Sequence, residues 1–266
     1  MGFADDMAKL MQKPFKRFSC VAAYACTPFL LGILGGYPVG AIAISELVKD
    51  EKISSKEAER ILPFCNNTGP AFIVGAVGSG IFASGKAGIM LYCCHIAAAL
   101  ILAVLSLHSL RNEQTFSLES VDNYPSLLRI LPACVRLALD KCFTICSFVI
   151  FFAVISEILK SLGIISSVSL ALNKASGLEI GICESLIAGF TELGGGIASM
   201  AGMKLCRSSL TLAAFILGFG SLSVHCQTFA VVSEANIKCA RHFVGRILHG
   251  AISALLIYIF YGIIRI

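Results

Sequence analysis

Long runs without Asp, Glu, Lys or Arg divide this sequence and constrain its fold more than any other feature. A straight helix needs roughly 20 mostly apolar residues to cross the hydrocarbon core of a bilayer, and most of the runs are that long. The runs therefore predict an all-α, polytopic bundle of transmembrane helices. They are Phe18–Ser45, Ile61–Gly85, Ala87–Leu110, Cys142–Ser156 (extended to Leu159), Ser208–Ser233 and Ile247–Ile264, and Leu178–Met203 is apolar apart from three Glu residues.

The overall composition agrees with a membrane protein and excludes other classes. Hydrophobic residues make up 57% of the 266 residues and charged residues 14%, whereas soluble domains have about 45–50% and about 25%. The net charge of +5 is spread over many loops, which is not the basic patch of a nucleic-acid-binding protein. We therefore expect the lipid bilayer as a partner and no nucleic acid.

Two of the apolar segments are interrupted by glycine and proline, which make a continuous helix costly. Phe18–Ser45 contains Gly35-Gly36-Tyr37-Pro38-Val39-Gly40, and Leu178–Met203 contains Gly194-Gly195-Gly196. Both patterns predict re-entrant helical hairpins, which enter the membrane and return on the same side. The remaining runs are predicted to be five full spans.

Basic residues predict the orientation, because Lys and Arg concentrate in cytoplasmic loops. They flank Phe18–Ser45 on both sides, so a hairpin there keeps both groups on one side. Following the chain from this point places the N-terminus, the 111–141 segment and the group Lys238, Arg241 and Arg246 in the cytoplasm. The prediction is a multi-pass protein of the cell membrane.

These segments divide the chain into an amphipathic N-terminal segment (1–17), a first membrane repeat (18–110), a cytoplasmic connection (111–141) and a second membrane repeat (142–266). The first repeat reads hairpin, span, span, and the second reads span, hairpin, span, span with opposite orientation. Such inverted repeats form midplane binding sites in secondary transporters. The first repeat lacks a leading helix, so we expect a second copy or a partner to supply one, unless the start of the chain is misassigned.

Catalytic and metal-binding patterns do not occur in this sequence. No Ser/His/Asp spacing, paired-carboxylate motif or Gly-x-Ser-x-Gly elbow is present. The adjacent residues Cys93, Cys94 and His95 would point in different directions on a helix, and most of the 12 cysteines lie in apolar runs, where a thiol behaves as a small hydrophobe. We expect no enzyme activity, no metal and no cofactor.

The first candidate site is the interruption of Ile61–Gly85 by Asn66, Asn67, Thr68, Gly69 and Pro70. Pro70 lacks an amide proton and disfavours helix at the residue before it, so nearby backbone groups are left free. Free backbone at membrane depth persists only where it is buried in protein or lines a wet cavity. The Asn amides suit a neutral polar solute; alternatively, they only connect helices through hydrogen bonds.

A second candidate is Glu192, which lies at the predicted tip of the second hairpin beside Thr191, Gly194 and Gly195. An ionisable group inside a membrane is by default a functional candidate. Glu192 would hydrogen-bond a solute or exchange a proton; the alternative is a buried acid bonded to backbone.

The third candidate group alternates with apolar residues after two glycines, Gly218 and Gly220. If the chain is unwound there, several of these side chains turn inward; otherwise the glycines only allow helices to approach closely. The group consists of Ser221, Ser223, His225 and Gln227, and the tip of the first hairpin adds Gly36, Tyr37 and Pro38.

Several of these motifs resemble one family. Gly36–Ala41, Asn66–Phe72 and Val74–Gly78 resemble the YlbJ family of sporulation integral membrane proteins, and Glu192–Gly196 and Gly220–His225 are similar to its second half. The resemblance covers residues 10–264 and implies the nucleoside recognition (Gate) superfamily, which includes ferrous-iron and concentrative nucleoside transporters. It implies transport or recognition of a small polar, nucleoside-like solute and a role in endospore formation. The alternative is a scaffold that assembles other sporulation proteins.

Overall fold

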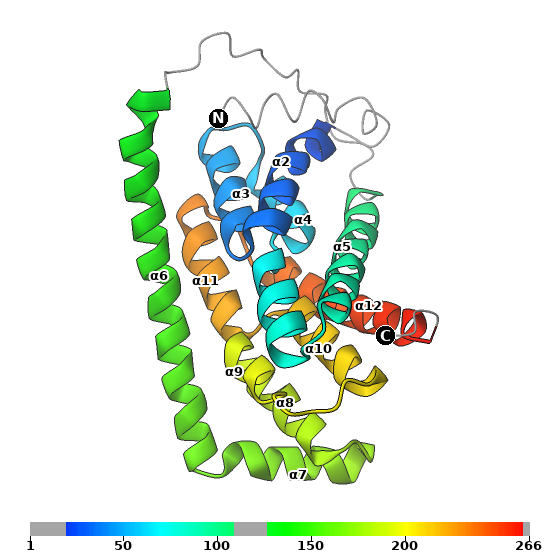
Figure 1. The fold of residues 1–266 in the computed structure, drawn as a ribbon. Helices are drawn as coiled ribbons and strands as arrows, with labels where there is room; N and C mark the ends of the chain where they lie inside the picture. The colour runs from blue at the N-terminus through cyan, green and yellow to red at the C-terminus, as the bar shows by residue number, and fades with distance from the viewer. Residues whose placement is uncertain (1–19, 109–126, 263–266) are drawn as a thin grey trace.

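The computed structural model describes residues 20–108 and 127–262, which form helices and no β-strand (Figure 1). The predicted amphipathic segment 1–17 lies outside the described residues. The first half contains α2 (Cys20–Gly35), α3 (Val39–Lys49), α4 (Ser55–Cys65), the π-helix η1 (Ala71–Ile81) and α5 (Gly85–His108). The second half contains α6 (Leu127–Ser161), α7 (Ile164–Ser176), α8 (Ile180–Thr191), α9 (Leu193–Ala198), α10 (Arg207–Phe219), α11 (Leu222–Val232), the 3₁₀ turn η2 (Ser233–Ala235) and α12 (Ala240–Phe260).

The all-helical membrane fold is confirmed by helix length and composition. Within the described parts, four stretches are long and apolar enough to cross a bilayer: Gly85–Leu107, Leu131–Ser161, Arg207–Ala235 and Ala240–Phe260. The predicted span Ile61–Gly85 is not among them, because a non-helical segment separates α4 from η1. Shorter apolar helices occupy Tyr24–Gly35, Ala71–Ile81 and Ile180–Thr191.

Helices α2 and α3 form the first predicted hairpin, with Gly36-Tyr37-Pro38 at its tip. Glycines on both limbs allow the hairpin to rest directly on the end of α4. A Cβ atom on Gly32 would lie 1.8 Å from the carbonyl oxygen of Cys65, and one on Gly40 would lie 2.0 Å from it. Only glycine permits this approach of backbone to backbone.

Local signals set the bounds of the broken helix pair α4–η1. Ser54 caps α4, because its hydroxyl accepts from the Glu57 N–H and the Glu57 carboxylate accepts from the Ser54 N–H at 2.7 Å, a capping box. The chain leaves the helix after Cys65, and η1 begins immediately after Pro70, which can occupy a helix start because it needs no N–H partner there.

The second hairpin breaks at a different place from the one predicted. Gly194, Gly195 and Gly196 lie inside α9, and the interruption between α8 and α9 is Glu192, which has extended backbone. The glycines instead allow close packing, since a Cβ atom on Gly196 would lie 2.1 Å from the Cα atom of Gly189 on α8.

The break between α10 and α11 is also shorter than predicted. Only Gly220 and Ser221 separate the two helices; Gly220 has a φ of +85°, and the Ser221 hydroxyl accepts from the Val224 N–H. Ser223, His225 and Gln227 are therefore helical residues of α11. Gly218 lies within α10 and packs against Gly250 of α12.

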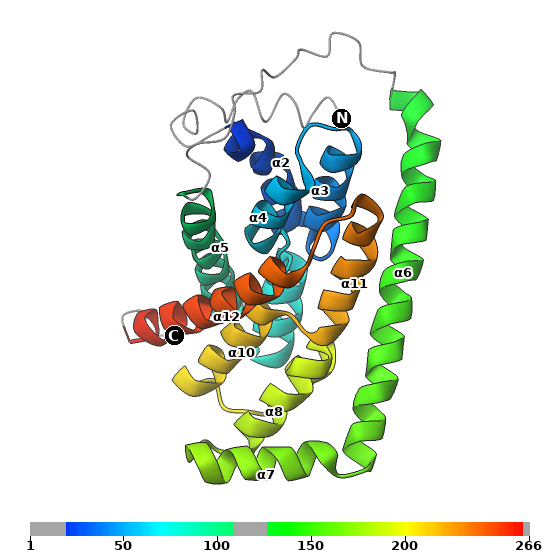
Figure 2. The same ribbon diagram turned by 180° about the vertical axis from the view of Figure 1, so that it is seen from behind.

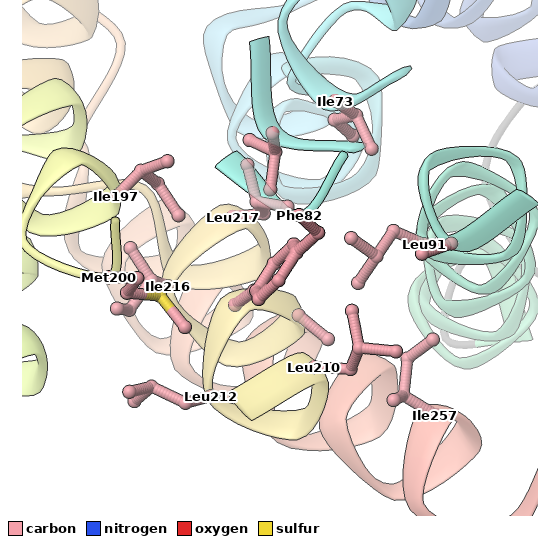
Figure 3. Close-up of a cluster of buried hydrophobic side chains, with 14 of the residues drawn as sticks. Ile73, Phe82, Leu91, Ile197, Met200, Leu210, Leu212, Ile216, Leu217 and Ile257 are labelled. Carbon is pink, nitrogen blue, oxygen red and sulfur yellow. The ribbon is translucent and has the colours of Figure 1, made fainter. Parts of the chain in front are cut away.

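A large apolar cluster joins η1 to the second half of the chain (Figure 3). Ile73 of η1 and Leu91 of α5 belong to the same buried cluster as Ile216 and Leu217 of α10 and Ile257 of α12. This cluster holds the helix after the first break against the helix before the second break.

Helix α6 lies along one side of the other helices, and α7 runs across its end (Figures 1 and 2). Helix α6 begins at Leu127, before the predicted span at Cys142. None of the residues in its most apolar stretch is buried inside the protein. Two hydrogen bonds connect it to the other helices: Ser156 with Thr191 at 2.8 Å, and Ser223 with the Phe148 carbonyl oxygen at 3.5 Å.

The same order of elements occurs in both halves. Hairpin α2–α3, the broken pair α4–η1 and the long helix α5 correspond in order to α8–α9, the broken pair α10–α11 and α12. The opposite orientation of the two sets, which would make them inverted repeats, stays a prediction.

The contact between the first hairpin and the end of α4 yields a stability prediction. We expect Gly40→Ala to destabilise the purified protein by about 1–3 kcal/mol, the usual cost of overpacking, because the new methyl group meets the Cys65 backbone. Gly75→Ala is the matched control, since its methyl group meets nothing within 4 Å. The readout is the melting temperature in detergent, and equal values for the two variants would contradict this contact.

Candidate functional site

The tip of the first hairpin and both helix breaks meet in the interior. A Cβ atom on Gly69 would lie 3.2 Å from the Cα atom of Gly36, and one on Gly220 would lie 3.5 Å from the Tyr37 hydroxyl oxygen. The Thr68 hydroxyl donates to the Leu217 carbonyl oxygen at 3.0 Å, close to the end of α10. The structure thus brings together three segments that were predicted separately.

The predicted residues of the first break are buried and hydrogen-bonded. Asn66, Asn67 and Thr68 are at most 3% exposed. The Asn66 amide donates to the Thr228 hydroxyl oxygen of α11 at 2.8 Å, and the Asn67 amide donates to the Phe64 carbonyl oxygen at 2.6 Å. The Asn66 Oδ1 atom is buried without a hydrogen-bond partner.

Arg246 of α12 lies against this break and is fully buried. Its Nη1 atom donates to the Asn66 carbonyl oxygen at 3.0 Å, the Asn67 Oδ1 atom at 3.3 Å and the Pro63 carbonyl oxygen at 3.5 Å. Its Nη2 atom donates to the Tyr37 hydroxyl, and its Cζ atom lies 5.3 Å from the centroid of the Tyr37 ring. One guanidinium therefore connects the hairpin tip, the break and α12.

Two histidines lie beside this guanidinium. Arg246 Nη1 is 2.5 Å from His249 Nδ1, and His249 Nε2 is 2.9 Å from the carbonyl oxygen of His95. The two imidazole rings have centroids 4.3 Å apart, and the Thr68 N–H donates to His95 Nε2 at 3.3 Å. Both histidines are at most 2% exposed.

No carboxylate balances this buried positive charge among the described residues, since no ion pair there involves Arg246. Its Nε atom is also buried without a hydrogen-bond partner. All of its hydrogen-bond acceptors are uncharged. Because neutral groups do not neutralise its positive charge, a buried cation of this kind can bind an anion favourably.

The sequence prediction for Arg246 was wrong in one respect. It placed Arg246 in a cytoplasmic loop before a final span at Ile247, whereas α12 begins at Ala240 and carries Arg246 inside the protein. The available signal was the spacing of His242, Arg246 and His249, which puts all three on one face of a helix. Gly245 on the same helix allows the close approach, since a Cβ atom there would lie 2.5 Å from Pro63 Cβ.

Glu192 does not share this cluster in the described structure. Its carboxylate accepts from the N–H groups of Gly194 at 2.9 Å and Gly195 at 2.5 Å, so it caps α9, which was the alternative left open for it. Neighbouring Thr191 bonds to the Ala188 carbonyl oxygen and to Ser156 of α6. These contacts fix the hairpin tip and the helix next to it.

The α11 candidates divide into two groups. Ser221 caps α11 at the second break, whereas the Gln227 amide donates to the Ser223 hydroxyl at 3.2 Å on the face toward α6. The His225 ring packs between aromatic rings, with centroids 5.0 Å from Phe219 and Phe243, and neither of its nitrogens has a hydrogen-bond partner. Pro38 contributes its carbonyl oxygen to the first turn of α3.

Charged contacts outside the predicted spans lie at the far end of the first hairpin. The Lys49 amine donates to the Glu234 carboxylate at 2.9 Å, and this hydrogen bond raises the pKa of Lys49. Both side chains are largely exposed, so the pair adds little stability. Within the described ranges, no three His, Cys, Asp or Glu side chains are placed to hold a metal ion.

Comparison with known proteins finds one curated relative. The chain is 27% identical over 252 residues to the sporulation integral membrane protein YlbJ of Bacillus subtilis (strain 168). The match covers 85% of this chain and 61% of the relative, so the chain spans about three fifths of that protein's length. No protein-family model and no solved structure matches the chain. The match agrees with the resemblance of the motifs, and the chain is similar to an integral membrane protein.

The contacts of Glu192 predict a structural effect of its removal. We expect Glu192→Ala to destabilise the protein by about 1 kcal/mol, because two N–H groups at the start of α9 lose their acceptor. Glu184→Ala is the control, since Glu184 is an exposed acid on α8. Melting temperatures in detergent measure the effect; a Glu192→Ala protein as stable as the control would argue against the capping role.

Proposed function

We propose that this chain binds a small anionic solute where the first hairpin tip and the two helix breaks meet, and that it transports or senses that solute at the membrane. The observation that carries the proposal is Arg246, fully buried and bonded only to neutral groups. An unpaired cation inside a membrane protein is costly, so its usual explanation is a solute or ion pathway.

The surroundings of Arg246 support a solute site. Broken helices at membrane depth are tolerated where they line a cavity or are enclosed in protein. Here the first break contacts the guanidinium, and the second lies beside Tyr37, to which the guanidinium donates. The hairpin tip supplies the Tyr37 hydroxyl, and the first break supplies the amide of Asn67. These groups can orient a polar solute after the guanidinium has attracted its charge.

The charge of Arg246 changes the class of solute expected from the sequence. The Asn amides suited a neutral polar solute and the family resemblance implied a nucleoside-like one, whereas a guanidinium favours a carboxylate or phosphate group. A nucleoside monophosphate satisfies both expectations, because it has a polar base and an anionic group. Inverted repeats around this site would provide alternating access.

The similarity to YlbJ supports a role in spore formation. We place the chain in the cell membrane with a cytoplasmic N-terminus, following the distribution of its basic residues. The alternative function is a sporulation scaffold that transports nothing; the buried, charged interior favours the transporter, because a scaffold does not require it.

A ligand screen on the purified chain tests this proposal. Thermal shift in detergent would compare inorganic phosphate, acetate, neutral nucleosides and nucleoside monophosphates. We expect the anions to raise the melting temperature and the neutral nucleosides to have little effect, because only the anions engage Arg246. Stabilisation by neutral nucleosides alone would overturn the anion site, and stabilisation by none of the four classes would favour the scaffold.

A matched pair of Asn variants tests the location of the site. Asn67→Ala removes the amide that would donate to the bound solute, and we expect it to weaken binding of the stabilising anion by about tenfold, the effect of losing a buried hydrogen bond to a charged group. Asn173→Ala is the control, because its amide also donates to a backbone carbonyl at 2.6 Å but belongs to α7. Calorimetric titration of both variants measures the affinities. Equal affinities would place the site elsewhere.

A further inference from the structure

His249 and Arg246 are in direct contact, and this contact fixes the protonation of His249. Arginine keeps its proton in proteins, so Arg246 Nη1 donates across the 2.5 Å contact and His249 Nδ1 accepts. The proton of the neutral ring is then on Nε2, where it is donated to the His95 carbonyl oxygen at 2.9 Å. Both contacts agree on the neutral Nε2–H tautomer.

A second proton on His249 is unfavourable while the site holds no anion. Protonation of Nδ1 would place two N–H donors against each other and two positive charges at contact distance. Arg246 itself does not depend on His249, however. Its Nη1 atom has two hydrogens and three other acceptors within reach: the Asn67 Oδ1 atom and the carbonyl oxygens of Pro63 and Asn66.

We infer that His249 couples solute binding to proton uptake: when an anion occupies the Arg246 site, His249 takes up a proton on Nδ1 and, as the imidazolium, donates an Nδ1–H hydrogen bond to the anion. The proton comes from the bulk solution and stays on His249. This inference rests on the proposed anion site. It adds a second cationic donor to that site and identifies the ion that accompanies the solute as H⁺.

The groups around His249 leave the bound anion as the main source of negative charge. None of the described titratable groups facing it is a carboxylate, and the break contributes only uncharged Asn side chains. The anion therefore offsets the repulsion between Arg246 and protonated His249 directly. The titratable groups are His95 of α5, Tyr37 of the hairpin tip, Arg246 and His242 of α12 and, beyond His242, His225 of α11.

Anion binding and proton uptake favour each other, as thermodynamic linkage requires. The anion-bound state holds one more proton than the free state, so a lower pH favours binding and binding in turn draws protons from solution. For one coupled proton, the apparent affinity rises by at most about tenfold for each unit of pH decrease.

Proton uptake by the purified full chain tests the inference. Acetate is a suitable probe because a simple carboxylic acid stays ionised above about pH 6 and releases no proton itself. A pH-indicator dye in weak buffer reports uptake, and calorimetry between pH 6 and 8 reports affinity. We expect about one proton taken up per acetate bound when His249 starts neutral, and tighter binding at lower pH.

The variant His249→Gln removes the titrating group while keeping both hydrogen bonds of the side chain. Its side-chain oxygen can accept from Arg246 and its amide can donate to the His95 carbonyl, but it does not titrate. We expect acetate binding without proton uptake and with an affinity independent of pH. His225→Gln is the control, because both ring nitrogens of His225 are buried and neither is hydrogen-bonded to Arg246, and we expect it to retain the uptake.

Each outcome has a distinct meaning. Acetate binding to the wild-type chain without proton uptake overturns the inference and leaves the anion site standing, and this measurement needs no variant to fold. Uptake that persists in His249→Gln overturns the role of His249. Failure of acetate and of every anion in the screen to bind overturns the proposed function instead.

Discussion

The hydrogen bonds from Arg246 to the carbonyl oxygens at the end of α4 are the interaction on which the rest of the structure depends. A helix that stops inside a membrane leaves carbonyl groups without N–H partners and without water. Arg246 donates to two such groups, at Pro63 and Asn66, and to the side chain of Asn67. The break is stable because α12 supplies the donors that the interrupted helix lacks.

Glycine makes this arrangement sterically feasible. Gly40 allows the first hairpin to reach the Cys65 carbonyl, and Gly245 allows α12 to reach Pro63 from another direction. Gly218 and Gly250 bring α10 and α12 together in the same region. Without a hydrophobic driving force between helices in lipid, such close packing is a principal source of association. Glycines in this sequence thus interrupt helices and also allow neighbouring helices to pack closely around the break.

Features set by local chemistry could be predicted from the sequence, whereas features set by distant partners could not. The Gly36-Tyr37-Pro38 tip and the interruption just before Pro70 follow from neighbouring residues and are found where they were predicted. The Ser54 cap follows from the spacing of Ser54 and Glu57. The roles of Glu192 and Arg246 depend on what lies beside them in space. Charge alone suggested a functional acid and a cytoplasmic base; burial and hydrogen bonding show a helix cap and an interior cation.

In the proposed function, Arg246 would bind the anion with the same N–H donors that now bind the hairpin tip and the end of α4. An anion that takes these hydrogen bonds competes with the contacts between α12, the break and Tyr37. A ligand changes a conformational equilibrium only through such differences in contact between states. Solute binding at this site would therefore loosen the enclosed interior, which is the step that a transporter needs for release.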